Sequence, residues 1–184
     1  VPQFDADSAY SYVARQVDFG PRVPGTPAQK EAAQWLEDEL RRHGATVYVQ
    51  NAEATAYDGT RLPIINIIGS FNPEARNRVL LMAHWDCRHL SDNDPDKSKY
   101  NTPVDGANDG ASGVGVLLEV ARQAGLSNPK MGIDIFLTDA EDYGAPTISM
   151  ARTRSHGGLS AHRHGAASHT SMAIVPTTAY CSTW

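Results

Sequence analysis

Residues 78–86 read Arg-Val-Leu-Leu-Met-Ala-His-Trp-Asp, an apolar run that ends in a polar triplet. An uninterrupted apolar run of this length is typical of a central strand in a sheet that is covered on both faces. Gly132-Ile-Asp-Ile-Phe-Leu-Thr138 predicts a second such strand, and Asp139-Ala-Glu-Asp142 follows it directly. Since ligands bind beyond the carboxyl ends of strands in open α/β sheets, we expect both polar segments to lie at one functional edge.

The segments on either side of this run alternate between helical and strand patterns. Thr26 is a helix cap and Pro27 a first-turn proline, and together they predict a helix through about His43. Strand alternation or helical periodicity recurs in three further segments: 46–51, 62–69 and 111–123. Strands interleaved with helices predict an α/β fold, and the hairpin-like early strands predict a mixed sheet.

The composition fits one globular domain and excludes several classes of protein. The chain has 184 residues, of which 41% are hydrophobic and 20% charged, so it can bury a substantial core. Its net charge of −5 argues against nucleic-acid binding. Two cysteines cannot form a disulfide framework. No apolar run reaches the roughly 18 residues that a membrane span needs.

The charge is distributed unevenly along the chain. All 21 acidic residues lie at or before Asp142, so the first 142 residues carry a net charge of −8 and the last 42 carry +3. The apolar periodicity also stops near residue 147. We therefore predict two parts, the N-terminal part of a catalytic domain in residues 1–146 and an anomalous tail in residues 147–184. The four histidines of this tail have irregular spacing, so we do not expect a second metal site there.

Three polar clusters could carry chemistry. They are His84-Trp-Asp86, Asp105-Gly-Ala-Asn-Asp109-Gly and Asp139-Ala-Glu141-Asp142. Each cluster has an ordinary alternative: a hydrogen-bonded His-x-Asp pair, a helix cap at Asp109, and a solvated acidic loop. An imidazole and several carboxylates that converge on one edge are, however, a ligand set suited to zinc. We therefore predict a metal site.

Five ordered motifs resemble a known family. They are Phe19-Gly-Pro-Arg-Val-Pro-Gly-Thr-Pro27, Asn66-Ile-Ile-Gly-Ser-Phe71, Ala83-His-Trp-Asp86, Gly106-Ala-Asn-Asp-Gly-Ala-Ser-Gly-Val114 and Asp139-Ala-Glu-Asp-Tyr-Gly144. The motifs resemble the zinc-dependent glutaminyl cyclases, most closely their bacterial branch, within the superfamily of co-catalytic zinc aminopeptidases. The resemblance implies a three-layer α/β/α sandwich, which this chain leaves incomplete at its C-terminal side.

The resemblance also implies roles for five residues. Asp109 is similar to the zinc-bridging aspartate, and Asp142 is similar to the zinc ligand beside the catalytic glutamate. Glu141 is similar to that catalytic acid and base. His84 resembles the histidine that binds a second zinc in the aminopeptidases, and Asp86 would orient it. One zinc ion is expected, or two if the chain is an aminopeptidase.

The implied reaction is the cyclisation of N-terminal glutamine in peptides and proteins to pyroglutamate, with release of ammonia. A zinc aminopeptidase and a non-catalytic binding domain of the same fold are the alternatives. We expect an extracytoplasmic location, periplasmic or lipid-anchored at the surface, with a signal that has been removed or is absent from this chain. The segment Arg88-His-Leu90 departs from the cyclase pattern, in which proline tends to follow the arginine.

A shifted reading frame would account for the tail. Back-translated and regrouped, Ala179-Tyr-Cys-Ser-Thr-Trp184 can encode Ile-Leu-Leu-Asp-Met, a strand of the type that the similar cyclases have downstream. We therefore hypothesise that residues after about Pro146 are a frameshifted translation; the alternative is a naturally divergent or disordered terminus. Zinc would keep only Asp109 and Asp142 of three expected protein ligands, so we expect the chain as written to be inactive.

The nucleotide sequence that follows the Pro146 codon tests the frameshift hypothesis. The alternate frame should continue without stop codons and should encode a cyclase-like strand where the present frame encodes residues 179–184. Early stop codons in that frame, or a reading without such a strand, would refute the hypothesis.

Overall fold

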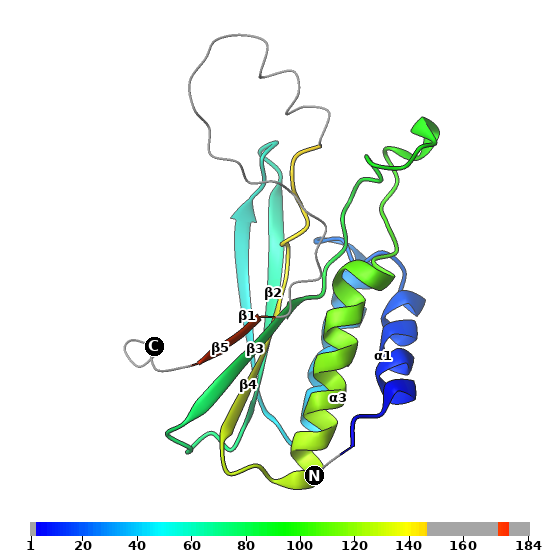
Figure 1. The fold of residues 1–184 in the computed structure, drawn as a ribbon. Helices are drawn as coiled ribbons and strands as arrows, with labels where there is room; N and C mark the ends of the chain where they lie inside the picture. The colour runs from blue at the N-terminus through cyan, green and yellow to red at the C-terminus, as the bar shows by residue number, and fades with distance from the viewer. Residues whose placement is uncertain (1–2, 147–172, 177–184) are drawn as a thin grey trace.

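The computed structural model describes residues 3–146 and the backbone of residues 173–176. These residues form three long helices and a five-stranded sheet (Figure 1). The elements are α1 (Ala6–Asp18), α2 (Pro27–Arg42), β1 (Thr46–Thr55), β2 (Arg61–Phe71), β3 (Arg78–His84), η1 (Lys97–Lys99), η2 (Ala107–Ala111), α3 (Ser112–Ser127), β4 (Gly132–Thr138) and β5 (Ala173–Pro176).

The sheet is mixed, and its one parallel pair is β3 with β4. The strand order is β1-β2-β4-β3-β5, and the other neighbouring pairs are antiparallel. α3 is the crossover that connects the two parallel strands. In their register His84 lies opposite Thr138. The segments that follow β3 and β4 therefore leave the sheet at the same edge, as the sequence predicts.

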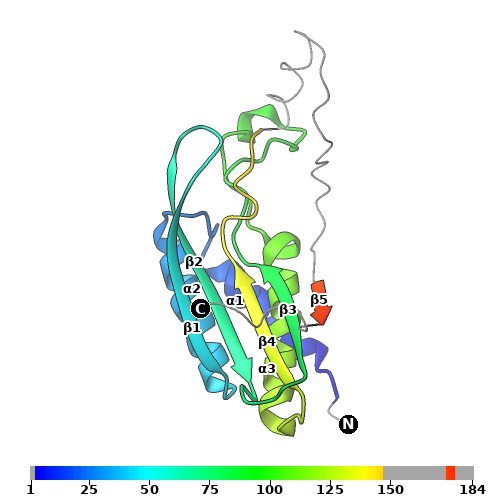
Figure 2. The same ribbon diagram turned by 90° about the vertical axis from the view of Figure 1, so that its left-hand side faces the viewer.

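The three helices lie on one face of the sheet (Figures 1 and 2). α2 packs on β1 and β2, α3 packs on β3 and β4, and α1 packs on α3. Their apolar residues join the inward residues of the strands in one core, whose fully buried members include Leu36, Leu40, Ile67, Val114, Leu117, Leu118, Ile135 and Leu137. No helix in the described part of the chain is both long and apolar enough to cross a bilayer.

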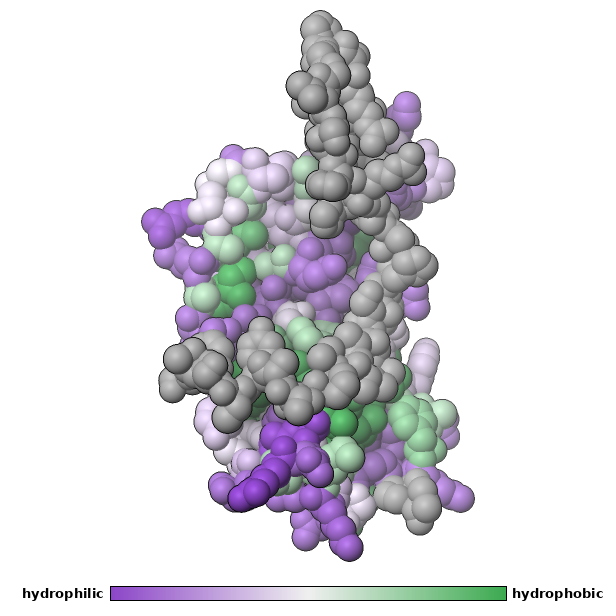
Figure 3. All heavy atoms as spheres, turned by 60° about the vertical axis from the view of Figure 1, so that its left-hand side comes forward, coloured by the Kyte–Doolittle hydropathy of each residue, from purple (hydrophilic) through white to green (hydrophobic). Residues whose placement is uncertain are grey.

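The other face of the sheet carries the alternate residues of the same strands. Ile67 and Leu81 belong to the helical core, so the neighbouring Ile68 and Met82 point away from it, as does Phe136. These three side chains are only partly buried, and hydrophobic surface is visible on this side of the molecule (Figure 3). The α/β class and the mixed sheet are confirmed. The described helices supply one of the two helical layers of the predicted sandwich.

Most elements agree with the sequence patterns. The side chain of Thr26 caps α2 by accepting a hydrogen bond from the Gln29 amide, and β4 has the predicted bounds. α1 is not predicted, although its buried residues Ala9, Tyr12 and Gln16 recur at helical spacing. Its sequence signal is Asp5, whose carboxylate caps the first turn.

β5 lies within the predicted anomalous tail. Its backbone pairs antiparallel with β3, with Leu80 opposite Val175. The other residues between 147 and 184 lie outside the described residues. The boundary at residue 146 and the frameshifted or disordered tail therefore stay predictions.

A buried arginine connects the loops at the carboxyl edge of the sheet. Arg22 has no solvent-exposed area, and its guanidinium donates hydrogen bonds to five main-chain carbonyls. The acceptors are the carbonyls of Gln16, Gly20, Trp85, Asp105 and Gly106. A Cβ atom at Gly106 would clash with Cys87 Sγ and lie 2.9 Å from Arg22 Nη2, so glycine is required for this close packing.

Replacing Arg22 by methionine would keep an apolar stem and leave these carbonyls without their donor. Because each unsatisfied buried group costs about 1–3 kcal/mol, Arg22→Met should lower the free energy of unfolding by roughly 3–5 kcal/mol. Urea denaturation followed by circular dichroism measures the change. Arg76→Met, at an exposed arginine, is the matched control and should change it by less than about 0.5 kcal/mol. Equal losses in both variants would contradict the role of Arg22.

Candidate metal centre

His84, the last residue of β3, is surrounded by carboxylates. Its Nε2 atom lies 3.1 Å from Asp109 Oδ1, and its Nδ1 atom lies 3.4 Å from Asp86 Oδ1 and 3.8 Å from Glu141 Oε2. Burial alone would lower the pKa of His84. The three carboxylates, Asp86 foremost, outweigh burial and raise the pKa to about 9. Without a metal ion, the protonated imidazole therefore balances part of their negative charge.

Asp86 connects the segment after β3 to the segment after β4. Its side chain is fully buried, and its two oxygens accept hydrogen bonds from the amides of Glu141 at 3.2 Å and Asp142 at 3.0 Å. The resemblance implies that Asp86 orients His84, and the two side chains do lie side by side. The bonds to the two amides are an additional role that the sequence does not reveal, because they join residues 55 and 56 positions apart.

Asp109 is presented by a kinked turn before α3. Its backbone is not helical, and Gly110 has a φ of +94°. A Cβ atom at Gly110 would lie 2.7 Å from the Asp86 carbonyl oxygen and 3.5 Å from the His84 ring, so a side chain there would displace the site. α3 begins without a side-chain cap, which argues against the alternative that Asp109 is a helix cap.

Asp142 and Glu141 differ sharply in exposure. The side chain of Asp142 is 18% exposed and that of Glu141 is 65% exposed. Burial raises the pKa of Asp142 to about 6, and the charges of Asp109 and Asp86 add to the effect. The carboxylates of Asp142 and Asp109 are therefore close enough to repel each other. His84 and Arg88 offset part of this repulsion, and a pKa that stays raised in spite of them marks a candidate functional site.

The donors present are of the kinds that bind zinc. Asp109 and Asp142 offer carboxylate oxygens, and His84 offers an imidazole nitrogen close to Asp109. Among residues 3–146, however, no group of three or more histidine, cysteine, aspartate and glutamate side chains is arranged to hold a metal ion. A zinc site takes three or more protein ligands, so the described residues do not by themselves make one.

Asp139 shapes the turn that leads to Glu141. Its Oδ2 atom accepts hydrogen bonds from Gln29 Nε2 at 2.6 Å and from the Ile65 amide at 2.8 Å, and its Oδ1 atom accepts one from the Ala140 amide. Ala140 has a φ of +61°, a left-handed conformation that is uncommon outside glycine. Burial raises the pKa of Asp139 to about 6. The sequence gives neither Asp139 nor Gln29 a separate role; the signal is the extra aspartate at the start of the acidic segment.

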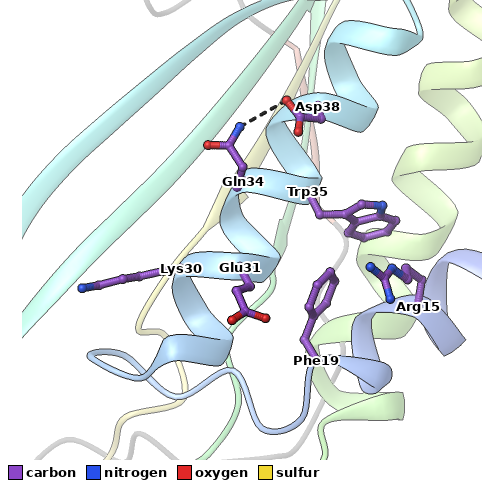
Figure 4. A pocket seen from close by; sticks show the side chains of 7 residues that line it. All are labelled: Arg15, Phe19, Lys30, Glu31, Gln34, Trp35 and Asp38. Carbon is purple, nitrogen blue, oxygen red and sulfur yellow. Dashed lines mark hydrogen bonds between the residues drawn. The ribbon is translucent and has the colours of Figure 1, made fainter.

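A pocket between α1 and α2 is separate from this centre. Phe19 and Trp35 lie beside each other in it, and the Arg15 guanidinium lies 4.4 Å from the centre of the Phe19 ring (Figure 4). Lys30, Glu31, Gln34 and Asp38 complete its lining. It contains none of the predicted site residues, which lie at the carboxyl edge of the sheet.

Solved structures of known proteins are similar to this chain. A Zn-dependent exopeptidase from Parabacteroides distasonis is 63% identical with a TM-score of 0.79, and the alignment covers 80% of this chain and 50% of that one. The glutaminyl cyclase of Tannerella forsythia is 56% identical with a TM-score of 0.79 over the same shares of the two chains. The predicted resemblance to bacterial glutaminyl cyclases is thus confirmed.

More distant relatives and the family assignment agree. The alkaline phosphatase isozyme conversion protein of Escherichia coli strain K12 is 26% identical over 135 residues, which cover 68% of this chain and 39% of that protein. This chain thus spans half the length of the two solved structures, and less of the curated relative. Residues 66–173, more than half of the chain, match Peptidase family M28. The chain therefore belongs to Peptidase family M28.

Proposed function

We propose that this domain catalyses the zinc-dependent cyclisation of N-terminal glutamine to pyroglutamate. The observation that carries the proposal is an exposed carboxylate on a fixed main chain. The Glu141 side chain is 65% exposed, while its amide is held by the buried Asp86. A general base needs both access to substrate and a fixed position. The 56% identity to a glutaminyl cyclase supports this choice of reaction.

Asp109 and Asp142 would hold the zinc ion, of which we expect one per chain. When bound, zinc supplies Lewis-acid polarisation of the γ-amide carbonyl of the substrate. The two carboxylates suit this role because they lie near each other and Asp142 is mostly buried.

Glu141 carries the proton transfers. It accepts a proton from the α-amine as the nitrogen attacks the γ-carbonyl carbon, and the new N–C bond closes the ring. The bond between that carbon and the amide nitrogen then breaks. Glu141 returns the proton to the departing nitrogen, which leaves as ammonia, and the carboxylate regains its initial state. The His84 ring lies 3.8 Å from the Glu141 carboxylate, on the side of the site where Asp109 lies.

A zinc aminopeptidase is the second candidate. His84 Nε2 and Asp109 Oδ1 are 3.1 Å apart, a distance at which both atoms could bind the same second zinc ion. The 63% identity to a Zn-dependent exopeptidase supports this candidate. In that reaction Glu141 would activate water for release of the N-terminal residue. A non-catalytic binding domain is the third candidate, and the exposed carboxylate of Glu141 beside Asp142 counts against it.

We further propose peptide and protein N-termini as substrates and an extracytoplasmic location. The chain as written should be inactive, because two recognisable zinc ligands are too few for a stable site.

Two forms of the protein test the reaction: the chain as written, and a frame-corrected chain in which residues after Pro146 are read in the alternate frame. With a glutamine-initiated peptide, the frame-corrected chain should release ammonia and contain one zinc ion, and the chain as written should do neither. Stoichiometric zinc and turnover in the chain as written would overturn its inactivity. Release of a free N-terminal residue instead of ammonia would favour the aminopeptidase.

Substitution of Glu141 separates catalysis from metal binding. In the frame-corrected chain, Glu141→Gln should lower kcat by at least about 100-fold and leave zinc content unchanged, because the side chain moves protons and does not bind the metal. Asp142→Asn should lower the zinc content itself. Glu53→Gln, on the exposed surface of β1, is the matched control and should retain the original kcat. An active Glu141→Gln variant would exclude the proposed role.

A further inference from the structure

Arg88, in the loop after β3, contacts the segment after β4. Its Nη1 atom donates a hydrogen bond to the Asp142 carbonyl at 3.4 Å, and its Nη2 atom donates one to the Ala145 carbonyl at 3.3 Å. The buried carboxylate of Asp92 accepts two further bonds from Arg88, at 2.7 and 2.8 Å, and fixes the guanidinium in place. These hydrogen bonds from Arg88 therefore hold the main chain on the C-terminal side of Glu141.

The next residue makes an aromatic contact to the same segment. The rings of His89 and Tyr143 are stacked, with centroids 3.8 Å apart and planes 6° from parallel. Tyr57, from the turn between β1 and β2, borders both rings at 6.1 and 6.4 Å. Two successive residues, Arg88 and His89, thus hold two successive residues, Asp142 and Tyr143. We call these four residues the clasp.

Ring stacking explains the position of the His89 side chain better than hydrogen bonding does. Its Nδ1 atom is buried and has no hydrogen-bond partner in the described part of the chain, and its Nε2 atom has a long contact of 3.3 Å with the Tyr57 hydroxyl. One ring nitrogen is therefore unsatisfied in either tautomer. His89 is also the position at which the sequence departs from the cyclase pattern, and a proline there would offer no aromatic ring.

We propose that His89 is a positioning residue, which by stacking on Tyr143 holds the main chain of Glu141 and Asp142 in place. The connection is short, because Tyr143 follows Asp142, and the amides of Asp142 and Glu141 are bonded to Asp86 at 3.0 and 3.2 Å. The consequence of this positioning for catalysis rests on the proposed function of Glu141. The effect of His89 on the position of the main chain is independent of that function.

Amide hydrogen exchange in the metal-free full chain tests the proposal. His89→Ala should speed exchange at the Glu141 and Asp142 amides by roughly two- to tenfold, the range expected from loss of one stacked pair. His89→Phe should restore the original rates, because its flat ring can still stack. Tyr143→Leu should reproduce the effect of His89→Ala from the opposite side. Tyr10→Ala, at a tyrosine that is 74% exposed on α1, is the control and should change nothing.

Amides of β3 and α3 should keep their exchange rates in all variants, which separates local positioning from general loss of stability. Original rates at Glu141 and Asp142 in both His89→Ala and Tyr143→Leu would overturn the proposal, as would failure of His89→Phe to restore them. In a zinc-binding form, His89→Ala should weaken zinc affinity by a similar factor, and His89→Phe should restore it. If the frame-corrected chain bound no zinc and released no ammonia, the proposed function would fail, and the exchange pattern would still support the clasp.

Discussion

The guanidinium of Arg22 is fully buried and donates to carbonyls from the end of α1, from the segment after β3 and from the loop before η2. A buried cation usually needs a carboxylate partner. Here main-chain carbonyl groups supply most of the stabilisation of the Arg22 charge. Burial lowers the pKa of Arg22, but an arginine remains protonated in a protein. Trp85 directly follows His84, and Gly106 lies three residues before Asp109. The Arg22 guanidinium therefore fixes the main chain close to both His84 and Asp109.

Fixing these loops brings together carboxylates that repel one another. Burial, with the charge of neighbouring aspartates, raises the pKa of both Asp139 and Asp142 from 3.8 to about 6. A raised folded-state pKa gives stability that is present below pH 3.8 and is lost as the pH rises through about 6. At neutral pH the metal-free fold therefore carries an electrostatic cost at this edge. A cation bound beside Asp142 would offset the repulsion that its carboxylate experiences from Asp109 and Asp86.

Features encoded locally could be predicted from the sequence, and features that join distant segments could not. The cap at Thr26 and the pairing of His84 with Thr138, directly before the acidic segment, follow from local patterns and from the parallel order of β3 and β4. The bonds from Asp86 to the amides after β4 depend on tertiary contact, as does the bond from Gln29 to Asp139 across 110 positions. α1 was missed for a related reason, since one position of its buried stripe is the polar Gln16, whose partner, the Ala111 carbonyl, is 95 positions away.

The unit formed by β3, α3 and β4 presents each part of the site that the structure describes. His84 ends β3, Asp109 lies in the turn before α3, and Asp142 follows β4. The close approach of Gly110 to the Asp86 carbonyl and the clasp fix these segments through contacts within residues 3–146. A third zinc ligand from outside this unit would therefore meet two carboxylates that are already positioned. Because folding has already ordered them, binding the ion costs less conformational entropy than assembling all three ligands together.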